Sequence, residues 1–208
     1  ASSAELFKDG VSVGTVAYDG SGNATFNVAG LVDGNTYVFT AKSLDAATNA
    51  SGLSSSVTIT YDTTPPAGAP SITTSAGSQN TGVITVSSNS VATATRVELF
   101  KDGVSFGIAN YNGSGLAAFN VTGLIDGPTY SFTAVSLDDA GNASTASAAV
   151  LVTYDTTAPD APSITTPAGV RGDSIVSVAR GSDLTAVSAR LFKDGTLVAT
   201  VAYTLGAV

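Results

Sequence analysis

The sequence predicts an all-β protein made of similar β-sandwich modules in tandem, and three observations support this fold class. Blocks of sequence recur at an interval of about 93 residues, short alternating runs rich in Val, Thr and Ser lie between turn signals, and only 7% of the chain is aromatic. Alternating runs of β-branched residues are typical of strands, and a fixed interval indicates copies of one structural unit. We therefore expect an extended string of modules with about seven strands each.

Two motifs define the repeat. The segment ELFKDGVS at Glu5–Ser12 returns unchanged at Glu98–Ser105, and a third LFKDG begins at Leu191. The segment YDTTPP at Tyr61–Pro66 returns as YDTTAP at Tyr154–Pro159. Both spacings are 93 residues between the first and second copies, so the whole module has been copied rather than an isolated motif.

These matches predict three modules. Residues 1–64 hold the C-terminal part of a first module, 65–157 hold a complete second module, and 158–208 hold the N-terminal part of a third. A partial sandwich leaves its apolar face uncovered. Two explanations stay open: the chain is a window on a longer polymer, which the register of the LFKDG copies favours, or neighbouring copies complete each other's partial modules.

Alternation and turn signals predict seven strands in the second module. They are Ser71–Thr74, Val83–Ser87, Arg96–Lys101, Val104–Tyr111, Ala117–Val121, Thr129–Leu137 and Ser147–Tyr154. The pair Asp102-Gly103 predicts a two-residue type I′ hairpin turn, because both central residues of that turn need a positive φ. Asp9-Gly10 and Asp194-Gly195 predict the same turn in the other two modules.

The strand at Thr129–Leu137 points to an Ig-like sandwich. Its alternation places Tyr130, Phe132 and Ala134 on one face, as in the inward row of a sandwich sheet. Tyr130 follows an Asp-Gly turn and resembles the tyrosine corner of Ig-like domains, in which the hydroxyl ties the crossing between the sheets to the backbone. Tyr37 is expected to do the same in the first module.

Composition excludes several function classes. The chain contains neither His nor Cys, so a Ser/His/Asp triad, a Cys nucleophile and a His-ligated zinc are excluded, and we expect no enzyme. A paired-carboxylate hydrolase stays formally open, but no cleft motif suggests one. The net charge of −8 argues against nucleic-acid partners. No run of 18 apolar residues is present, so membrane insertion is not expected.

Acidic residues at the module joins predict a calcium site. Fourteen of the sixteen acidic residues are Asp, a bias typical of turns and of oxygen-ligand cation sites. In an Ig-like topology the linker that enters a module runs beside that module's own loop between its last two strands. Asp62 should therefore approach Asp138, Asp139 and Asn142, whose oxygens suit Ca²⁺. The alternative is that Asp138–Asn142 forms a plain turn.

Other candidate residues are weaker. Asp155 and Asp160 enter the third module and predict a second calcium site there, with Asp183 as a possible partner. Asp33 precedes a Gly, and we expect it to serve only a turn. Arg171–Asp173 forms an RGD tripeptide in an expected loop, but tripeptides arise easily by chance, and the other modules have no equivalent.

The residues around the last two strands carry a family resemblance. The segment SLDDAGNAS at Ser136–Ser144, followed by a strand and by YDTTAP at Tyr154–Pro159, resembles the bacterial Ig-like repeats of giant surface adhesins, many of which are exported by type I secretion. The resemblance implies a rod that projects a terminal binding domain, often stiffened by Ca²⁺ at module junctions. The first module departs from the pattern, because Asp45–Asn49 lacks the second Asp and the Gly. Its cation site should be weaker.

We therefore expect a structural stalk of a bacterial cell-surface adhesin or biofilm matrix protein. Its location would be extracellular or at the cell surface, and its partners would be neighbouring Ig-like modules of the same or adjacent chains. Two alternatives stay open: a self-assembling subunit of an extracellular filament or surface layer, and an accessory module of a secreted polysaccharide-active enzyme. A stalk should be monomeric, a filament subunit should polymerise, and an accessory module should bind a glycan.

Overall fold

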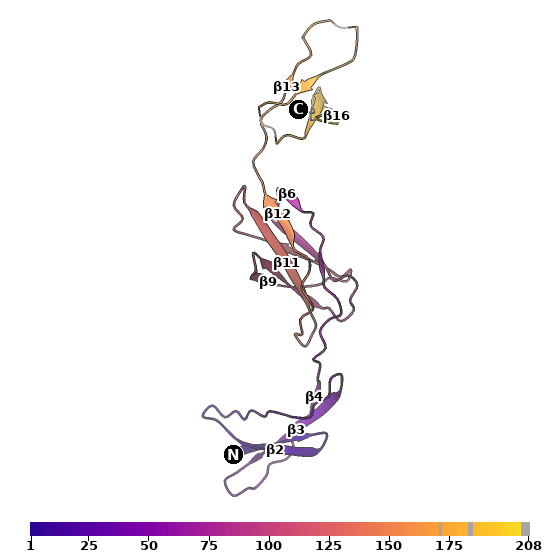
Figure 1. Cartoon of the computed structure of the whole chain (residues 1–208). Helices are drawn as coiled ribbons and strands as arrows, with labels where there is room; N and C mark the ends of the chain where they lie inside the picture. The colour runs from indigo at the N-terminus through magenta and orange to yellow at the C-terminus, as the bar shows by residue number, and fades with distance from the viewer. Residues whose placement is uncertain (171, 183–184, 205–208) are drawn as a thin grey trace. The chain divides into compact units, whose positions relative to one another are not determined.

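The computed structural model describes residues 1–170, 172–182 and 185–204 (Figure 1). The chain divides into two compact units, Ala1–Tyr154 and Asp155–Val208. Every regular element among the described residues is a β-strand, so the predicted all-β class is confirmed. In this part of the chain no helix is long and apolar enough to cross a membrane.

The second module is a complete sandwich of two sheets (Figure 1). Its strands are β5 (Ser71–Ile72), β6 (Gly77–Gln79), β7 (Val83–Ser87), β8 (Arg96–Lys101), β9 (Val104–Asn110), β10 (Leu116–Asn120), β11 (Thr129–Leu137) and β12 (Val150–Tyr154). One sheet has the order β10-β7-β5, and the other has the order β6-β12-β11-β8-β9. This arrangement is that of an Ig-like sandwich, in which the A, B and E strands face the C, F and G strands.

The core of this module lies between the two sheets. Alternate residues of the facing strands supply it, including Ile84 and Val86 of β7, Val97 and Leu99 of β8, and Phe132 of β11, all at most 1% exposed. Burial of apolar surface stabilises a fold by about 25 cal/mol per Å². The closed core therefore holds the module together and fixes the places of its loops.

Most strand bounds follow the sequence prediction. β7, β8 and β11 have the predicted limits. β12 begins at Val150 rather than Ser147, because Ser147 bonds to β11 through its side chain: its Oγ accepts the N–H of Ala134 at 3.0 Å. β6 was not predicted, since Gly77–Gln79 has no alternation of apolar and polar residues.

The recurring LFKDG motif forms the predicted hairpin turn in all three modules. Asp102 and Gly103 have φ values of 51° and 78°, and the pairs Asp9-Gly10 and Asp194-Gly195 lie within a degree of them. The side chain of Asp102 has a second role, because its Oδ1 accepts the N–H of Ser131 at 2.9 Å. The Asp of the motif therefore fastens the hairpin to the neighbouring strand β11.

The predicted tyrosine corner is also present. The Tyr130 hydroxyl accepts the N–H of Ile125 at 2.8 Å, and the Tyr37 hydroxyl accepts the N–H of Val32 at the same distance. The Lys101 ammonium lies 4.6 Å from the centroid of the Tyr130 ring, a cation–π contact. The Lys of LFKDG thus covers the ring whose hydroxyl holds the loop.

The first module consists of a single sheet of order β2-β1-β3-β4 (Figure 1). Its strands are β1 (Ser3–Lys8), β2 (Val11–Ala17), β3 (Thr36–Leu44) and β4 (Val57–Thr60), the counterparts of β8, β9, β11 and β12. Residues 24–28 match the strand predicted at 117–121 but form no strand here. In the second module that segment pairs with β7, and none of the described residues 1–64 supplies a counterpart of β7.

The second unit holds two separate strand pairs, β13 (Ser163–Ile164) with β14 (Val178–Ala179) and β15 (Ser188–Lys193) with β16 (Thr196–Ala202). Ser163 pairs with Ala179 and Ile164 with Val178, as Ser71 and Ile72 pair with Ser87 and Val86 in the second module. The boundary between the two units in the sequence follows Tyr154. The module limits at residues 64 and 157 stay predictions.

Candidate functional site

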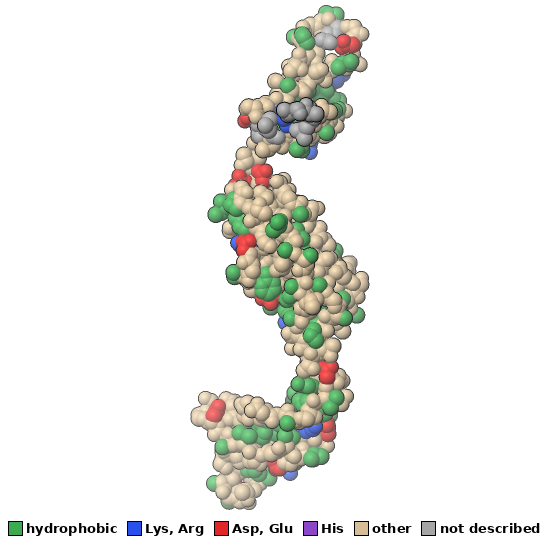
Figure 2. All heavy atoms as spheres, viewed as in Figure 1, with side chains coloured by type: hydrophobic (Ala, Val, Ile, Leu, Met, Phe, Trp, Pro, Cys, Tyr) green, Lys and Arg blue, Asp and Glu red, His purple; other side chains and the backbone are tan. Residues whose placement is uncertain are grey.

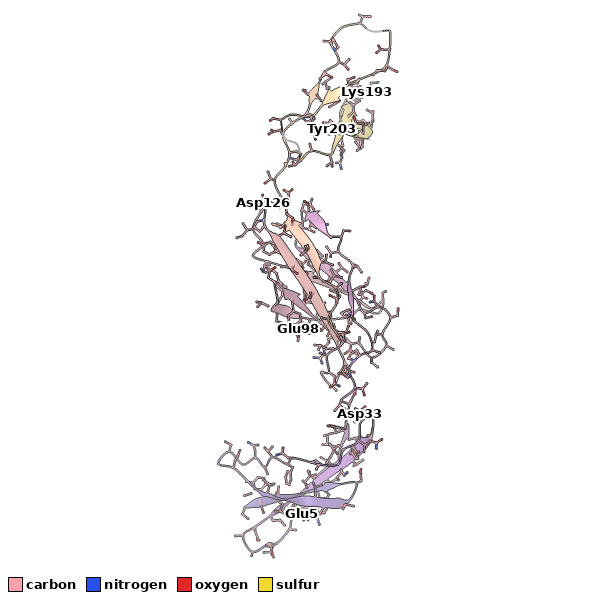
Figure 3. The ribbon with its side chains drawn as sticks, in the orientation of Figure 1. Glu5, Asp33, Glu98, Asp126, Lys193 and Tyr203 are labelled. Atoms are coloured by element: carbon pink, nitrogen blue, oxygen red, sulfur yellow. The ribbon has the colours of Figure 1, made fainter. Side chains whose placement is uncertain are left out.

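The linker that follows the first module is fixed to that module by Asp33, which lies where the chain leaves the sheet (Figure 3). Asp33 Oδ1 accepts the N–H of Thr63, and also its hydroxyl at 2.8 Å, while Oδ2 accepts the hydroxyl of Thr64 at 2.6 Å. These bonds, that from the Thr64 hydroxyl first, lower the pKa of Asp33 from its ordinary value of 3.8. The Gly34 N–H donates to the Tyr61 carbonyl at 2.8 Å. The chain from Tyr61 to Thr64 is therefore held against the first module.

The loop Asp138–Asn142 of the second module is closed by bonds between its two ends. Asp138 Oδ1 accepts the Asn142 N–H at 2.8 Å, and Oδ2 accepts the Asn142 Nδ2 at 3.0 Å. Gly141 has a φ of 92°, in the left-handed region that glycine tolerates best. Burial alone would raise the pKa of Asp138, but the bonds from Asn142 and from the N–H groups of Gly141 and Ala140 outweigh it, so that pKa is lowered. Asp138 is thus an ionised turn residue that is only 3% exposed.

Asn142 connects this loop to the linker. Its Nδ2 also donates to the main-chain carbonyl of Asp62 at 3.0 Å, so the amide serves both acceptors with its two protons. Arg96 Nη2 donates to the Asp138 carbonyl at 2.7 Å and supports the loop from β8. A series of hydrogen bonds therefore runs from Asp33 through the linker to Asn142. We call this group, Asp33, Asp62–Thr64, Asp138 and Asn142, the junction.

The structure places the residues of the predicted calcium site as follows. Asp62 meets Asn142 through a carbonyl and an amide nitrogen, its own Oδ1 accepts the Thr64 N–H at 3.0 Å, and Asp139 is exposed. Among the described residues no group of three acidic side chains lies close enough to hold a metal ion. On the face shown in Figure 2, acidic side chains are scattered rather than gathered. Both Asp138 oxygens accept hydrogen bonds from Asn142, and calcium binding at this loop stays a prediction.

The residues predicted for a second site have separate partners. Asp155 Oδ1 accepts the N–H of Thr157 at 3.1 Å, and Asp160 Oδ2 accepts the hydroxyl of Ser182 at 3.3 Å. Asp183, their possible partner, lies outside the described residues, as does Arg171 of the RGD tripeptide. Calcium binding at either place stays a prediction.

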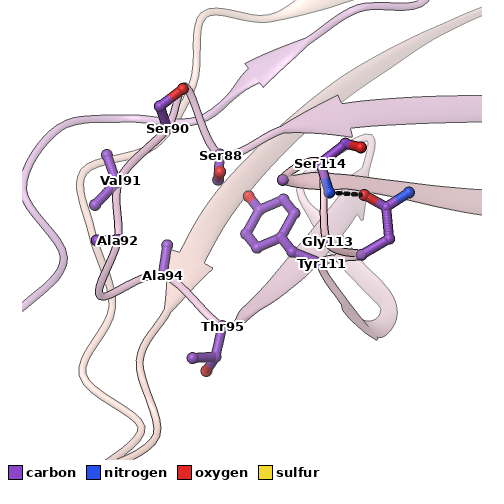
Figure 4. Close-up of a pocket in the computed structure, with 11 residues that line it drawn as sticks. Ser88, Ser90, Val91, Ala92, Ala94, Thr95, Tyr111, Gly113 and Ser114 are labelled. Carbon is purple, nitrogen blue, oxygen red and sulfur yellow. Dashed lines mark hydrogen bonds between the residues drawn. The ribbon is translucent and has the colours of Figure 1, made fainter.

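A hollow of about 500 Å³ lies in the second module between the loops around Ser88 and Tyr111 (Figure 4). The Tyr111 hydroxyl bonds to the Ser136 Oγ at 2.9 Å, and burial raises the pKa of Tyr111. Asn112 Oδ1 accepts the Ser114 N–H at 2.9 Å. The side chains that line the hollow offer hydroxyl, amide and methyl groups but neither carboxylates nor amines. They provide hydrogen bonding rather than acid–base chemistry.

Sequence reasoning missed the role of Asp33. The Asp-Gly pair was interpreted as a turn, and nothing local shows that its carboxylate binds Thr63 and Thr64 thirty residues later. One signal was available: both the Asp-Gly pair and the DTT segment recur with the same spacing, at Asp126 and Asp155. Two motifs that keep their separation through a duplication are candidates for contact.

Comparison with known proteins gives partial matches. No protein-family model matches the chain. It is 30% identical over 189 residues to exoglucanase B of Cellulomonas fimi, which covers 80% of this chain and 15% of that protein. It is 38% identical over 139 residues to chitinase A1 of Niallia circulans, covering 62% and 19% respectively. The chain thus spans less than a fifth of the length of either relative.

Solved structures with some likeness include the fibronectin(III)-like modules of Clostridium thermocellum CbhA, with a TM-score of 0.46 and 16% identity over 74% of this chain and 78% of that chain. The FN1–FN3 domains of chicken CNTN1 give a TM-score of 0.41 and 12% identity over 96% and 76%. At these scores the fold assignment rests on the strand order described above. The second module is an Ig-like β-sandwich. The adhesin type of repeat stays a prediction.

Proposed function

We propose that the chain is a non-catalytic spacer of a secreted or surface-exposed bacterial protein, in which it holds other parts of that protein apart at a set orientation. The junction is the observation that supports this role. Its linker is hydrogen-bonded to Asp33 on one side and to Asn142 on the other. Bonds at both ends restrict the bending that a free linker of this length would allow.

Two settings fit a spacer. The first is the stalk of a bacterial cell-surface adhesin or biofilm matrix protein, which the resemblance of the SLDDAGNAS and YDTTAP segments supports. The second is an accessory segment of a secreted polysaccharide-active enzyme, which the matches to an exoglucanase and a chitinase support. In both settings the partners are neighbouring modules, and nucleic acid is disfavoured by the net charge of −8.

The junction can be tested by measuring how freely the first two modules move. The chain has no Cys, so spin labels can be attached to Val11→Cys and Val104→Cys, equivalent hairpin positions that are 70% and 71% exposed. In the parent chain we expect double electron–electron resonance to give a narrow distribution of distances between the two spin labels. Asn142→Ala removes the bond to the Asp62 carbonyl and should broaden the distribution.

The matched control is Asn49→Ala. Asn49 closes the equivalent loop of the first module, with its Nδ2 donating to Asp45 at 2.9 Å. Removing it disturbs a loop of the same geometry without touching the linker bond between Asp62 and Asn142, so the distribution should stay narrow. An equally narrow distribution in Asn142→Ala would refute the proposed role of the junction.

The two settings can be separated by glycan binding. A pure spacer should remain in solution when the chain is mixed with insoluble cellulose or chitin and centrifuged. Retention on one of these polymers that is lost in a Tyr111→Ala variant would favour the accessory segment, because Tyr111 lies at the hollow of hydroxyl and amide groups. Retention that is unchanged in this variant would place binding elsewhere on the chain.

Calcium needs a separate measurement. After chelation, titration of Ca²⁺ into the chain in a calorimeter should give heat if the predicted site exists. Asp139→Ala is the sharpest variant, because Asp139 is exposed and its loss should leave the Asp138–Asn142 bonds in place. Heat that this variant abolishes would support the calcium prediction, and no heat in the parent chain would leave a junction made by hydrogen bonds alone.

A further inference from the structure

The outer face of the larger sheet in the second module carries an aromatic ring. Successive side chains of a strand point to opposite faces of its sheet. In β8, Val97 and Leu99 belong to the core, whereas Phe100 is half-buried and is not among the described side chains that pack on that core. Phe100 therefore lies on the solvent side of the sheet, on the face away from β7 and β10.

Polar groups and an apolar side chain surround this ring. Phe100 pairs with Thr133 of β11 and with Ser105 of β9. On the same face, Glu98 pairs with Val135 of β11 (Figure 3). Glu98 Oε1 accepts the hydroxyl of Ser105, so the carboxylate is held beside the ring. We call these five residues, Glu98, Phe100, Ser105, Thr133 and Val135, the platform.

The first module has the same face with one difference. Phe7 stands at the position of Phe100, but Lys42 stands where the second module has Val135. The Lys42 ammonium lies 5.5 Å from the centroid of the Phe7 ring, a cation–π contact. The face of this ring is thus directed toward residue 42. Val135 carries no ammonium, so no cation covers the Phe100 ring from the equivalent position.

Further apolar side chains extend the platform across the sheet. Ile108 pairs with Glu98, and Leu151 pairs with Ser131, whose side chain lies on the same face as that of Thr133. Ile108 and Leu151 are each 55% exposed. They belong to β9 and β12, which flank β8 and β11 in the sheet. Four strands at the usual spacing cover about 14 Å, so the surface is long enough for more than one ring of a ligand.

We propose that the platform binds a neutral glycan. The negative face of an aromatic ring attracts the polarised C–H groups of a sugar ring, which places the sugar over Phe100. The carboxylate of Glu98 and the hydroxyls of Ser105 and Thr133 then bond the hydroxyl groups at the edge of the sugar. This inference rests on the accessory setting of the proposed function, for which it names the site and the class of ligand.

Charge and size favour a neutral glycan over other occupants. The platform holds a carboxylate, and Arg96, further along β8, donates to the Asp138 carbonyl. With the net charge of −8, the chain repels an anionic polymer. A standard protein–protein interface takes about 20–30 residues on each side, which is more than the platform and its two flanking residues provide. A glycan needs only an apolar surface with a few well-placed polar groups.

Reciprocal substitutions at one position of the repeat test the platform. Val135→Lys gives the second module the residue of the first, and Lys42→Val does the reverse, so each new side chain already occurs at that position in the repeat. Binding of cellohexaose and of chitohexaose, two neutral oligosaccharides, is measured by calorimetry with the full chain. We expect the affinity for at least one of them to fall tenfold or more in Val135→Lys. Lys42→Val should bind more oligosaccharide per chain than the parent, because it uncovers the Phe7 ring.

Tyr111→Ala is the control, because Tyr111 lies at the hollow and not on the platform. Its affinity should equal that of the parent chain. Binding that needs Tyr111 but tolerates Val135→Lys would keep the accessory setting and overturn this inference. No binding of either oligosaccharide to the folded parent chain would overturn both, and the spacer role would still be tested by the spin-label distances.

Light scattering tests whether a second copy covers the platform instead. We expect the mass of the parent chain to stay at 20.5 kDa as its concentration rises. A larger mass that returns to this value in Val135→Lys would identify a second copy of the chain as the occupant and overturn the inference.

Discussion

The first and second modules share 40 of 60 residues between 5–64 and 98–157, but only the second has a closed core. In both, the sheet ladder has the same register: Leu6 pairs with Ala41 as Leu99 pairs with Ala134. Leu99 is fully buried, whereas Leu6 is only half-buried. The comparison shows that hydrogen bonds within one sheet set the strands and their register, whereas burial requires the second sheet.

Residues 24–28 make the same distinction at one segment. Their sequence, ATFNV, differs little from AAFNV at 117–121, yet only the second copy lies in a strand, β10. β10 forms its ladder with β7 over five residue pairs. A strand is thus a property of two paired segments, and the sequence of one of them does not suffice.

The largest expected effect tests core closure. Phe132→Ala removes a fully buried ring, and such changes cost about 3–5 kcal/mol of unfolding free energy. Phe39→Ala, at the equivalent half-buried position, should cost less than half as much. Urea unfolding followed by tyrosine fluorescence gives both values, and equal losses would show that the first module has a closed core in solution.

The tyrosine corner should behave alike in both modules. Tyr130→Phe and Tyr37→Phe each leave a backbone N–H without its 2.8 Å partner, at a cost of about 0.5–1.5 kcal/mol because Ile125 and Val32 are exposed. Amide exchange at Ile125 and Val32 should also become faster. If the amide exchange rate at Val32 is the same in Tyr37→Phe as in the parent chain, the corner of the first module is open in solution.

The loops Asp45–Asn49 and Asp138–Asn142 differ in strain. Thr48 has a φ of 66°, a conformation that β-branched residues rarely adopt, and Gly141 occupies the equivalent position. Thr48→Gly should therefore stabilise the first module by about 1 kcal/mol, and Gly141→Thr should destabilise the second by about 1–2 kcal/mol. A Cβ at Gly141 would meet no atom within 4 Å, so the cost lies in the backbone. Thermal unfolding of the two variants measures whether stability rises in Thr48→Gly and falls in Gly141→Thr.

The smallest expected effect is a dependence on pH. The pKa of Asp138 is below its ordinary 3.8 in the folded chain. The carboxylate therefore stabilises the fold fully above about pH 4, and this contribution is lost as pH falls through the lowered native pKa. Asp138→Asn should reduce stability at neutral pH and flatten its decline below pH 4. This assignment is wrong if the free energy of unfolding, measured in urea, falls below pH 4 as steeply in Asp138→Asn as in the parent chain.

The sequence predicted those parts of the fold that depend on local pattern. The Asp-Gly pairs predicted the hairpins because positive φ is a local requirement, and alternation predicted β7, β8 and β11. It did not predict β6, whose pairing with β12 depends on tertiary structure, or the hydroxyl of Ser147, which replaces a carbonyl of a sheet ladder.

The junction was only partly predictable for the same reason. Topology indicated that the linker at Asp62 runs beside the loop of Asn142, and the two are joined by a hydrogen bond. The sequence did not predict which atoms meet. The main-chain carbonyl of Asp62 accepts from the Asn142 amide, and Asp138 uses its carboxylate to close its own turn. Residue types identify possible ligands, but the geometry of a loop decides which of their atoms remain available.

At the junction the linker is bound by Asp33 of the preceding module and by Asn142 of the following one. Both positions recur in the 93-residue unit. Recombination that inserts or deletes one whole 93-residue unit, wherever in the unit it begins, therefore leaves each joint with a counterpart of Asp33 and a counterpart of Asn142. A lineage could lengthen or shorten this protein in fixed steps without evolving a new joint.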